Sequence, residues 1–435
     1  MDILKWGITN KCNLNCKHCI LGKTNLGNDM SLNSAKKVVD HAVELGCKEV
    51  LFSVKEPFCY EKFGELVKYC RINKIVCSIL TNGTNISDKD INQLYNSYIN
   101  YIAISLEGIS SMTNDTIRGE GQFTKTIEFV KRINELNSVN DVYIPLILQI
   151  CITPINIQEL IEHLPDFVQK YKFVMVTLGN VYKAGNALEN PGIVMESLQY
   201  KKLIYELIRV LMCSENCGIY RWKDLLPYDA AYLNLLSNNE IELHIPHCSM
   251  FNENQFYVLP NGDLCRCNLL IGTDLLPDEE LYLGKNFLDN KLDTILPLGD
   301  KYKPIKDGFC KQCYYTNKCS PCFFCYNKKD VDENIKKECQ LGYETVSKIC
   351  NLIFNGDVNF SLKKDSAIKF QNGNISIIGK NVCNIRNEKN IYEKLIELQW
   401  NGGGNNKFYS FEKRIIEKLC FSGVIQIEGE EGRTI

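Results

Sequence analysis

The chain has 435 residues, of which 45% are hydrophobic and 23% charged, and its formal net charge is -2. This balance excludes an intrinsically disordered chain and gives no general attraction for nucleic acid. A chain of this length can bury a large core, and we expect two or three domains. No apolar run approaches the ~18 to 20 residues that cross a bilayer, and no signal segment follows Met1, so we expect a cytoplasmic protein without membrane contact.

Short apolar segments alternate with helical patterns from residue 4 to residue 180, which predicts repeated β-α units around a parallel sheet. Ser31 is expected to cap a helix that ends at Gly46. The sequence therefore predicts an α/β fold that begins with a partial (β/α)6 TIM-like barrel over residues 1–200. Its six expected strands are 4–9, 49–54, 76–81, 101–106, 144–152 and 173–178.

Three cysteines follow the first expected strand with the spacing Cys-x3-Cys-x2-Cys, namely Cys12, Cys16 and Cys19. Three thiolates can hold a 4Fe-4S cluster and leave one iron open to a chelating ligand. A structural zinc site is the alternative, but it needs four ligands, and the nearest further candidate is His18 inside the same loop. An inert group of buried cysteines is a third reading.

This spacing resembles the signature of the radical SAM superfamily. The resemblance implies that a reduced cluster cleaves S-adenosylmethionine (SAM) into methionine and a 5'-deoxyadenosyl radical, which abstracts a hydrogen atom from the substrate. No catalytic base is marked by spacing, so the catalytic residue stays unknown.

Ligand sites in parallel β/α folds collect at the carboxyl ends of the strands. The second expected strand ends in Ser53-Val54-Lys55-Glu56-Pro57, where radical SAM proteins usually have Gly-Gly-Glu-Pro. The resemblance implies that Glu56 helps to hold the amino group of SAM, and a solvated loop residue is the alternative. Val54 and Lys55 replace both glycines, which would have allowed close approach of the backbone to a ligand.

The ends of the fourth and fifth expected strands also look like family segments. By that resemblance Ser105 and Arg118 contact the ribose or the carboxylate of SAM, and an arginine suits a carboxylate through paired donors. Thr153, with Asn156, would lie near the adenine. Taken alone, an arginine is more often a surface residue than a ligand.

A second cysteine-rich region spans residues 248–339. Its order of cysteines resembles the SPASM domain, which carries two auxiliary 4Fe-4S clusters. The resemblance gives one cluster the ligands Cys310, Cys313, Cys319 and Cys339. The other would use Cys248, Cys267, one of Cys322 and Cys325, with Cys325 preferred, and Cys265 as a possible fourth ligand. Paired Cys-x2-Cys turns also bind zinc, so a zinc ribbon is the alternative.

The remaining segments complete four expected domains. Helical sequence at about 197–236 is expected to form a bridge over 201–247, the SPASM domain covers 248–350, and a small α+β module covers 351–435. This module has expected strands at 359–362, 367–370, 375–378 and 424–427 and helices at 392–399 and 411–419. It weakly resembles modules that capture a leader peptide as an added strand, and a simple C-terminal cap is the alternative.

Two hypotheses follow. In the first, the chain is a radical SAM/SPASM enzyme that modifies a ribosomally made precursor peptide by a thioether or carbon-carbon cross-link or by epimerisation. It would use one active and two auxiliary clusters, SAM, and an electron donor such as flavodoxin or ferredoxin. Enzymes of sulfatase maturation and of cofactor or tetrapyrrole synthesis are alternatives within this class. In the second, the chain is a non-catalytic zinc-binding adaptor.

Overall fold

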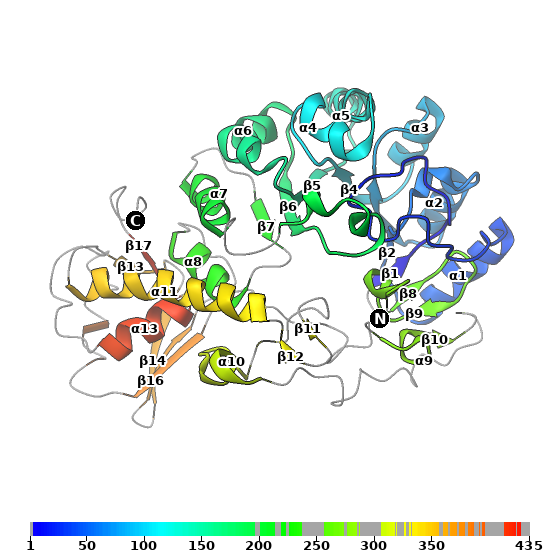
Figure 1. Ribbon diagram of the computed structural model, residues 1–435. Helices are drawn as coiled ribbons and strands as arrows, with labels where there is room; N and C mark the ends of the chain where they lie inside the picture. Colours follow the sequence, from blue (N-terminus) through cyan, green and yellow to red (C-terminus); the bar gives the residue numbers. More distant parts are fainter. Residues whose placement is uncertain are drawn as a thin grey trace. The chain divides into compact units, whose positions relative to one another are not determined.

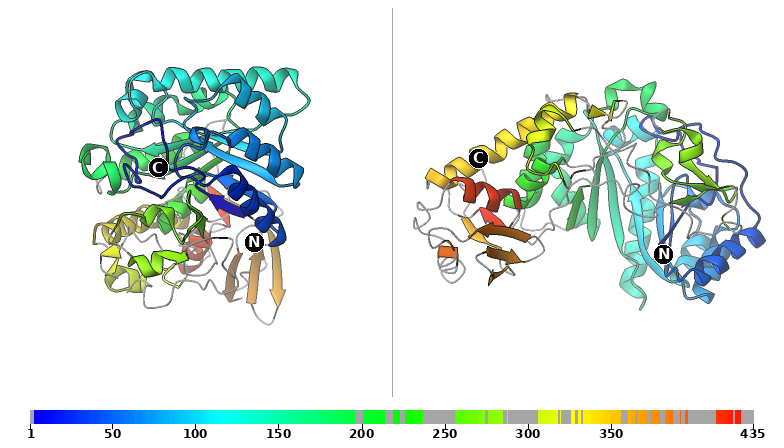
Figure 2. Two further views of the ribbon diagram at one scale, coloured as in Figure 1. Left: turned by 90° about the vertical axis from the view of Figure 1, so that its right-hand side faces the viewer. Right: turned by 90° about the horizontal axis from the view of Figure 1, so that it is seen from below.

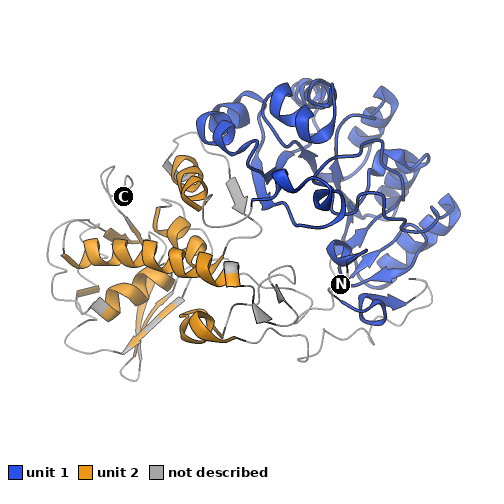
Figure 3. Cartoon of the chain, in the orientation of Figure 1, with its two compact units in different colours: residues 1–195, 216–223, 248–303 blue, residues 196–215, 224–247, 304–435 orange. Residues whose placement is uncertain are grey.

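The computed structural model forms two compact units (Figure 3), residues 1–195, 216–223 and 248–303 in unit 1, and residues 196–215, 224–247 and 304–435 in unit 2. We describe each unit by itself. The residues that the structure describes are 3–195, 201–213, 219–222, 226–236, 256–273, 276–284, 287, 306–317, 319, 326–327, 330–331, 333–355, 360–363, 366–371, 374–378, 382–386, 391, 394–395, 413–422 and 424–427.

Unit 1 is built on a ten-stranded sheet of order β10-β9-β8-β1-β2-β3-β4-β5-β6-β7 (Figure 1). The strands from β8 to β7 in this order are parallel, whereas β9 and β10 are antiparallel to their neighbours. The bounds are β1 Ile3–Trp6, β2 Glu49–Phe52, β3 Val76–Thr81, β4 Ile99–Ser105, β5 Leu146–Ile152, β6 Met175–Asn180, β7 Ile219–Trp222, β8 Tyr257–Val258, β9 Leu264–Cys265 and β10 Tyr282–Gly284.

Helices follow the strands in chain order and cover one side of this sheet (Figure 2). Because β1 to β6 are neighbours in sequence order, right-handed crossovers place all their helices on the same face. The bounds are α1 Leu32–Glu44, α2 Phe63–Ile72, α3 Asp88–Tyr95, α4 Ser111–Arg118, α5 Gln122–Val139 and α6 Ile157–Lys170, with α9 Asp278–Leu281 after β9 and short 3-10 turns η1 Pro57–Cys59, η2 Gly185–Leu188 and η3 Pro191–Ile193.

The predicted α/β fold with a partial barrel-like parallel sheet is confirmed. All six expected strands are present, with boundaries that differ by three residues or fewer. The Ser31 side chain accepts a hydrogen bond from the Ser34 N–H at the start of α1, as expected for an N-cap. The sequence interpretation missed α4 and the four strands that extend the sheet, of which β8 and β9 have only two residues each.

Unit 2 contains five described helices and three small antiparallel sheets. The helices are α7 Lys201–Cys213, α8 Pro227–Leu236, α10 Gly308–Gln312, α11 Glu333–Asn355 and α13 Lys413–Ser422. The sheets are β13 Phe360–Leu362 with β17 Ile425–Ile427, β14 Ala367–Gln371 with β15 Asn374–Ile378 and β16 Val382–Arg386, and β11 Tyr326–Asn327 with β12 Asp330–Val331.

Aromatic side chains form the centre of unit 2. Tyr228 is 1% exposed, and its ring centroid lies 5.2 Å from that of Tyr315, 5.4 Å from that of Tyr343 and 5.5 Å from that of Phe421. These contacts join α8, α11 and α13 to the loop that follows α10. Rings packed edge to face at this spacing stabilise a core beyond the area that they bury.

One expectation for this half of the chain is corrected. The helical sequence at 197–236 contains α7 and α8, but β7 lies between them and pairs with β6 of unit 1. The long helix α11 and the strand β16 were not expected. The expected helix 392–399 lies largely outside the described residues. Among the described helices, none combines the length and the apolar character that a membrane span requires.

Candidate active site

The cysteine loop, residues 7–31, leaves β1 at the carboxyl edge of the sheet. Cys12 is exposed, Cys16 is buried and Cys19 is partly buried. Backbone hydrogen bonds hold the loop at two points, from Lys17 N to the Ile117 oxygen at 2.9 Å and from Asn186 N to the Cys19 oxygen at 2.9 Å. The three thiols are therefore presented by a loop that α4 and the segment after β6 keep in place.

Gly185 lets the segment after β6 approach the cysteine loop. It has a φ of +56°, and a Cβ atom built on it would overlap the carbonyl oxygens of Cys19 and Ile20. The neighbouring Asn186 side chain donates to the Cys16 oxygen at 2.9 Å. Only glycine satisfies both the left-handed backbone and the close approach.

The end of β2 keeps a backbone that glycine would normally adopt. Val54 has a φ of 86°, which is a strained conformation for a β-branched residue. Its side chain packs closely against Gly7, where an added Cβ would lie 3.1 Å from Val54 Cβ. The next residue also serves the cysteine loop, since Lys55 Nζ donates to the Gly22 oxygen at 2.9 Å. Val54 and Lys55, which stand where the family usually has glycines, thus keep the turn and add contacts to the cysteine loop.

Glu56 is 2% exposed, so the alternative of a solvated loop residue is wrong. Its Oε1 accepts from Thr81 Oγ1 at 2.7 Å and from Phe58 N at 3.2 Å, and its Oε2 accepts from Asn82 N at 2.8 Å. Burial raises the pKa of the carboxyl. These bonds fix the carboxylate between the ends of β2 and β3.

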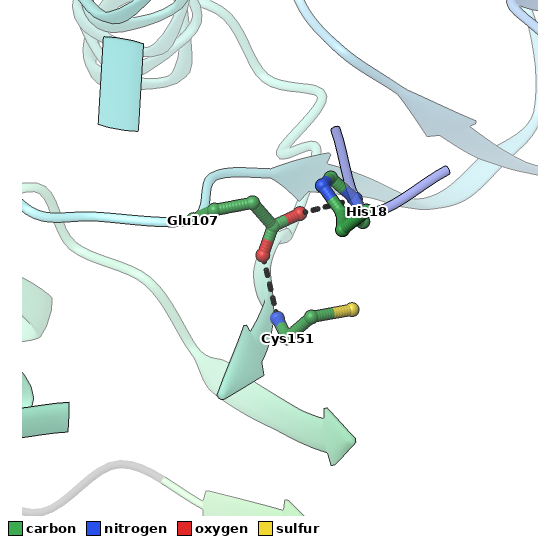
Figure 4. Close-up of side chains that lie close together, drawn as sticks. All are labelled: His18, Glu107 and Cys151. Carbon is green, nitrogen blue, oxygen red and sulfur yellow. Dashed lines mark hydrogen bonds and ion pairs between the residues drawn. The ribbon is translucent and has the colours of Figure 1, made fainter. Parts of the chain in front are cut away.

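Glu107 joins three segments of the site, although the sequence interpretation gave it no role. Arg118 Nη2 donates to Glu107 Oε1 at 2.7 Å, and His18 Nε2 lies 3.1 Å from the same oxygen (Figure 4). Glu107 Oε2 accepts from Cys151 N at 2.6 Å. One signal in the sequence could have identified Glu107: it is a carboxylate at the end of β4, two residues after Ser105 and eleven residues before Arg118.

The charges around Glu107 determine its ionisation. Burial raises the pKa of Glu107, but the charges of His18 and Arg118 outweigh burial and hold the pKa at about 2. Arg118 itself is only 8% exposed, so it is not the surface residue that its type alone would suggest. The carboxylate is therefore ionised at neutral pH.

The other two residues expected to contact SAM differ in their surroundings. Ser105, at the end of β4, is half-buried, and its hydroxyl has no hydrogen-bond partner among the described residues. Thr153 is fully buried and its Oγ1 accepts from the Ile155 and Asn156 N–H groups at 3.2 Å. Asn156 Nδ2 in turn donates to the Glu107 carbonyl at 2.8 Å. The structure shows Thr153 and Asn156 bracing a turn, and the contact of Thr153 with adenine stays a prediction.

The residues of this site fit an iron-sulfur cluster with SAM. Burial raises the pKa of the Cys16 thiol to about 11. Two buried nitrogens beside the thiols, His18 Nδ1 and Arg118 Nε, have no partner. Soft thiols match iron-sulfur clusters, and unfilled polar positions match a polar ligand.

The cysteines of unit 2 gather around α10 and α11. Burial raises the pKa of Cys319 to about 12, with Cys313 and Cys310 adding to the effect. Burial also raises the pKa of Cys339, with Asp229 adding to the effect and Cys319 and Cys310 adding less. Charges on Cys310 and Cys319 thus influence one another and Cys339. Tyr315 N donates to Cys313 Sγ at 3.4 Å, and Lys306 Nζ donates to the Cys319 oxygen at 2.7 Å.

The second predicted set of auxiliary ligands is only partly visible. Cys265 is buried in β9 of unit 1, and its thiol donates to the Cys267 carbonyl at 3.3 Å. Burial raises the pKa of Cys265 to about 12. The other members of the set, Cys248, Cys322 and Cys325, lie outside the described residues.

Residues 6–165, which include the three-thiol loop and the strands β2 to β5, match the family model described as Radical SAM superfamily.

Curated relatives match part of the chain. The Fe-coproporphyrin III synthase of Methanosarcina barkeri is 28% identical over 259 residues, which is 55% of this chain and 63% of that protein. The mycofactocin maturase MftC of Mycobacterium tuberculosis is 30% identical over 132 residues, which is 30% of this chain and 34% of that protein. The chain therefore spans less than two thirds of the length of these relatives.

Solved structures extend the likeness in fold to more of the chain. SuiB of Streptococcus suis bound to SAM superposes with a TM-score of 0.59 at 18% identity, covering 77% of each chain. The structure anSMEcpe with bound AdoMet gives a TM-score of 0.51 at 17% identity, covering 82% of this chain and 99% of that one. The region beyond the barrel thus also resembles SPASM enzymes in fold.

Replacing Gly185 with alanine is expected to loosen the cysteine loop. The new Cβ would overlap two carbonyl oxygens and occupy a left-handed backbone, which costs about 1 to 3 kcal/mol of unfolding free energy for the backbone alone. Gly192→Ala is the matched control, because a Cβ there meets nothing within 4 Å. Thermal unfolding should show a lower midpoint for Gly185→Ala only, and equal midpoints would contradict the assigned contact.

Replacing Glu107 with alanine is expected to cost about 3 to 5 kcal/mol of unfolding free energy at pH 7, because Arg118 is left buried without its counter-charge. The folded-state pKa of about 2 lies below the ordinary value of 4.5, so the contribution is complete above pH 4.5 and is lost as the pH falls through about 2. Urea unfolding at several pH values should show a difference that shrinks in this window. The exposed Glu65→Ala should stay within about 0.5 kcal/mol of the wild type throughout.

Proposed function

We propose that this radical SAM enzyme modifies a precursor peptide. In this proposal Cys12, Cys16 and Cys19 hold the active cluster, and Glu56, Ser105 and Arg118 hold SAM. When bound, the reduced cluster supplies the electron that cleaves SAM to methionine and a 5'-deoxyadenosyl radical, which removes a hydrogen atom from the substrate. The protein orients the reacting groups and excludes water from them.

The observation that supports this proposal most strongly is the pairing of the cysteine loop with Arg118. Three thiols come from one loop, and the guanidinium next to them is buried with its Nε unpartnered. A buried cation that is held by one carboxylate and still has a free N–H suits the carboxylate of a bound amino acid. A zinc-binding adaptor would have no use for this cation, which would repel the metal.

Similarity to maturases supports a peptide as the substrate. SuiB has been solved bound to the precursor peptide SuiA, and MftC is described as a mycofactocin maturase. Unit 2 also has three short antiparallel strands, β14 to β16, in the position along the chain where the sequence predicts a peptide-binding module. A thioether or carbon-carbon cross-link or an epimerised residue would be the product, and a flavodoxin or ferredoxin would supply electrons.

We further propose that Cys310, Cys313, Cys319 and Cys339 hold one auxiliary cluster. The mutual electrostatic influence of these thiols supports it. Cys265, Cys267 and Cys248, with Cys322 or Cys325, remain the proposed ligands of a second auxiliary cluster.

A tetrapyrrole is the second candidate substrate. The match to Fe-coproporphyrin III synthase covers 259 residues, whereas the match to MftC covers 132. Incubating the reduced enzyme separately with a candidate precursor peptide and with a coproporphyrin would decide between them, since product mass is read directly. A mass change in the porphyrin alone would overturn the peptide proposal.

Replacing Cys16 with alanine should abolish SAM cleavage. The variant is expected to lose about four irons per chain and to form no 5'-deoxyadenosine under dithionite, because a cluster needs all three thiolates of the loop. Cys70→Ala, which changes a buried packing cysteine of α2, should keep both properties. Zinc in place of iron in the wild type, or no deoxyadenosine from it, would refute the proposed function.

Replacing Cys339 with alanine should remove about four irons while leaving SAM cleavage without substrate intact. Cys350→Ala lies in the same helix α11 and removes a buried thiol outside the proposed ligand set, so it serves as the matched control. Iron analysis and the electron paramagnetic resonance (EPR) spectrum of the reduced protein measure the outcome. Equal iron contents in the two variants would contradict the assignment.

A further inference from the structure

A buried ion pair joins two helices of unit 2. Lys201 of α7 is 4% exposed and Asp229 of α8 is 3% exposed, and Lys201 Nζ lies 2.5 Å from Asp229 Oδ2. The Tyr205 hydroxyl donates to Asp229 Oδ1 at 2.8 Å, so both carboxylate oxygens have partners. Removing two charges from water is costly, and apolar side chains of similar volume often stabilise a fold as well as a buried ion pair does. Stability alone is therefore a weak explanation for this pair.

Gly342 of α11 brings the ion pair against the helix that carries Cys339. A Cβ atom built on Gly342 would lie 3.1 Å from the Tyr205 hydroxyl oxygen and 3.2 Å from Asp229 Oδ1. Residues three positions apart share one face of a helix, so Cys339 lies on the same face of α11, about one turn before Gly342. The carboxylate of Asp229 thus lies against the face of α11 that carries the thiol.

The cation of the pair reaches the same turn of α11. Lys201 Nζ lies 3.9 Å from Glu338 Oε2, and Glu338 directly precedes Cys339 in the sequence. Both members of the pair also act on the thiol. Burial raises the pKa of Cys339 most, Asp229 raises it further, and Lys201 lowers it. The sulfur of Cys339 therefore lies within the electrostatic reach of two opposite charges.

The residue before Asp229 lies beside a second proposed cluster ligand. The Tyr228 hydroxyl accepts a hydrogen bond from Tyr314 N at 3.2 Å, and Tyr314 directly follows Cys313. Tyr228 is buried at the centre of unit 2. Two consecutive residues of α8 thus lie next to segments that carry two of the four thiols, so α8 lies against the proposed cluster site.

We propose that the buried ion pair of Lys201 and Asp229 sets the reduction potential of the auxiliary cluster held by Cys310, Cys313, Cys319 and Cys339. This inference rests on the proposed function, which assigns the four thiols to a cluster. The step concerned is the addition of one electron to the cluster from a flavodoxin, a ferredoxin or dithionite, and no covalent bond forms or breaks in it.

The two charges of the pair act in opposite directions on this step. Reduction potentials of iron-sulfur clusters depend on the charges, hydrogen bonds and solvent exposure around them. Reduction adds a negative charge, so the cation of Lys201 stabilises the reduced cluster and raises the potential. The carboxylate of Asp229 opposes reduction and lowers the potential. Because both groups are buried, ions in solution screen them only weakly.

Variants that remove one charge at a time test the sign of each effect. Lys201→Met removes the cation and keeps a long apolar side chain, so the equilibrium constant for reduction should fall about tenfold, which is about 59 mV for a one-electron couple. Asp229→Asn removes the anion, and its amide oxygen can still accept from Tyr205. This variant should shift the potential upward by a similar amount. A merely structural role of the pair predicts no opposition of sign.

Two exposed residues of α7 provide matched controls. Lys202→Met removes a cation from the position next to Lys201, and Glu206→Gln removes an anion from the same helix. Water and salt screen exposed charges, so each control should stay within about twofold of the wild-type equilibrium constant. The double variant Lys201→Met/Asp229→Asn removes both buried charges and should also lie between the two single variants.

The measurement uses the full chain reconstituted with iron and sulfide under anaerobic conditions, with iron content determined for each variant. The EPR signal that is absent from Cys339→Ala identifies the cluster concerned. Its intensity during a redox titration with dithionite gives the midpoint potential. This quantity does not depend on turnover or on knowledge of the substrate.

Shifts of the same sign in the two single variants, or no shift in either, would overturn the inference. Should one of them not retain iron, the sign of the shift in the other decides. Loss of iron from both would also overturn it, because the pair would then serve the fold of α11 and not the potential. A Cys339→Ala variant with the iron content of the wild type is instead the failure of the proposed auxiliary cluster, so the two cases are distinguishable.

Discussion

The buried carboxylate of Glu107, between an arginine and a histidine, holds the candidate active site together. Removing an ion from water is costly, and Glu107 meets that cost with Arg118, His18 and the N–H of Cys151. These partners come from α4, from the loop after β1 and from β5. The geometry of the cysteine loop thus depends on an ion pair formed by residues about a hundred positions further along the chain.

Backbone strain at the end of β2 points to the same site. Val54 occupies a left-handed conformation that costs of order 1 to 3 kcal/mol for a residue other than glycine. Such strain persists only where surrounding contacts fix the chain, and here Val54 packs on Gly7 while Lys55 bonds to Gly22. The turn directs Glu56 to the end of β3 in spite of the lost glycines.

Most of the correct structural predictions rest on local sequence patterns. A few neighbouring residues encode each strand of the barrel and the helix cap at Ser31, and both predictions agree with the structure. Glu107 was missed because its importance comes from His18 and Arg118, which are 89 positions before it and 11 after it. Strands β8 and β9 were missed because two residues give no alternating pattern, and only pairing with β1 makes them part of the sheet.

The presence of a cysteine alone also does not tell a predicted metal ligand from a cysteine that only packs in the core. Cys70 and Cys77 are buried in the core of unit 1, and the contact with Cys70, together with burial, raises the pKa of Cys77. Burial likewise raises the pKa of Cys16 and Cys319, so a raised pKa does not mark a ligand. The surroundings of the cysteines differ more clearly. Cys16 lies in a loop beside Arg118, a buried arginine whose Nε has no hydrogen-bond partner, whereas Cys70 and Cys77 lie in the apolar core. An unsatisfied polar group is therefore the feature that sets a predicted ligand such as Cys16 apart from a packing cysteine.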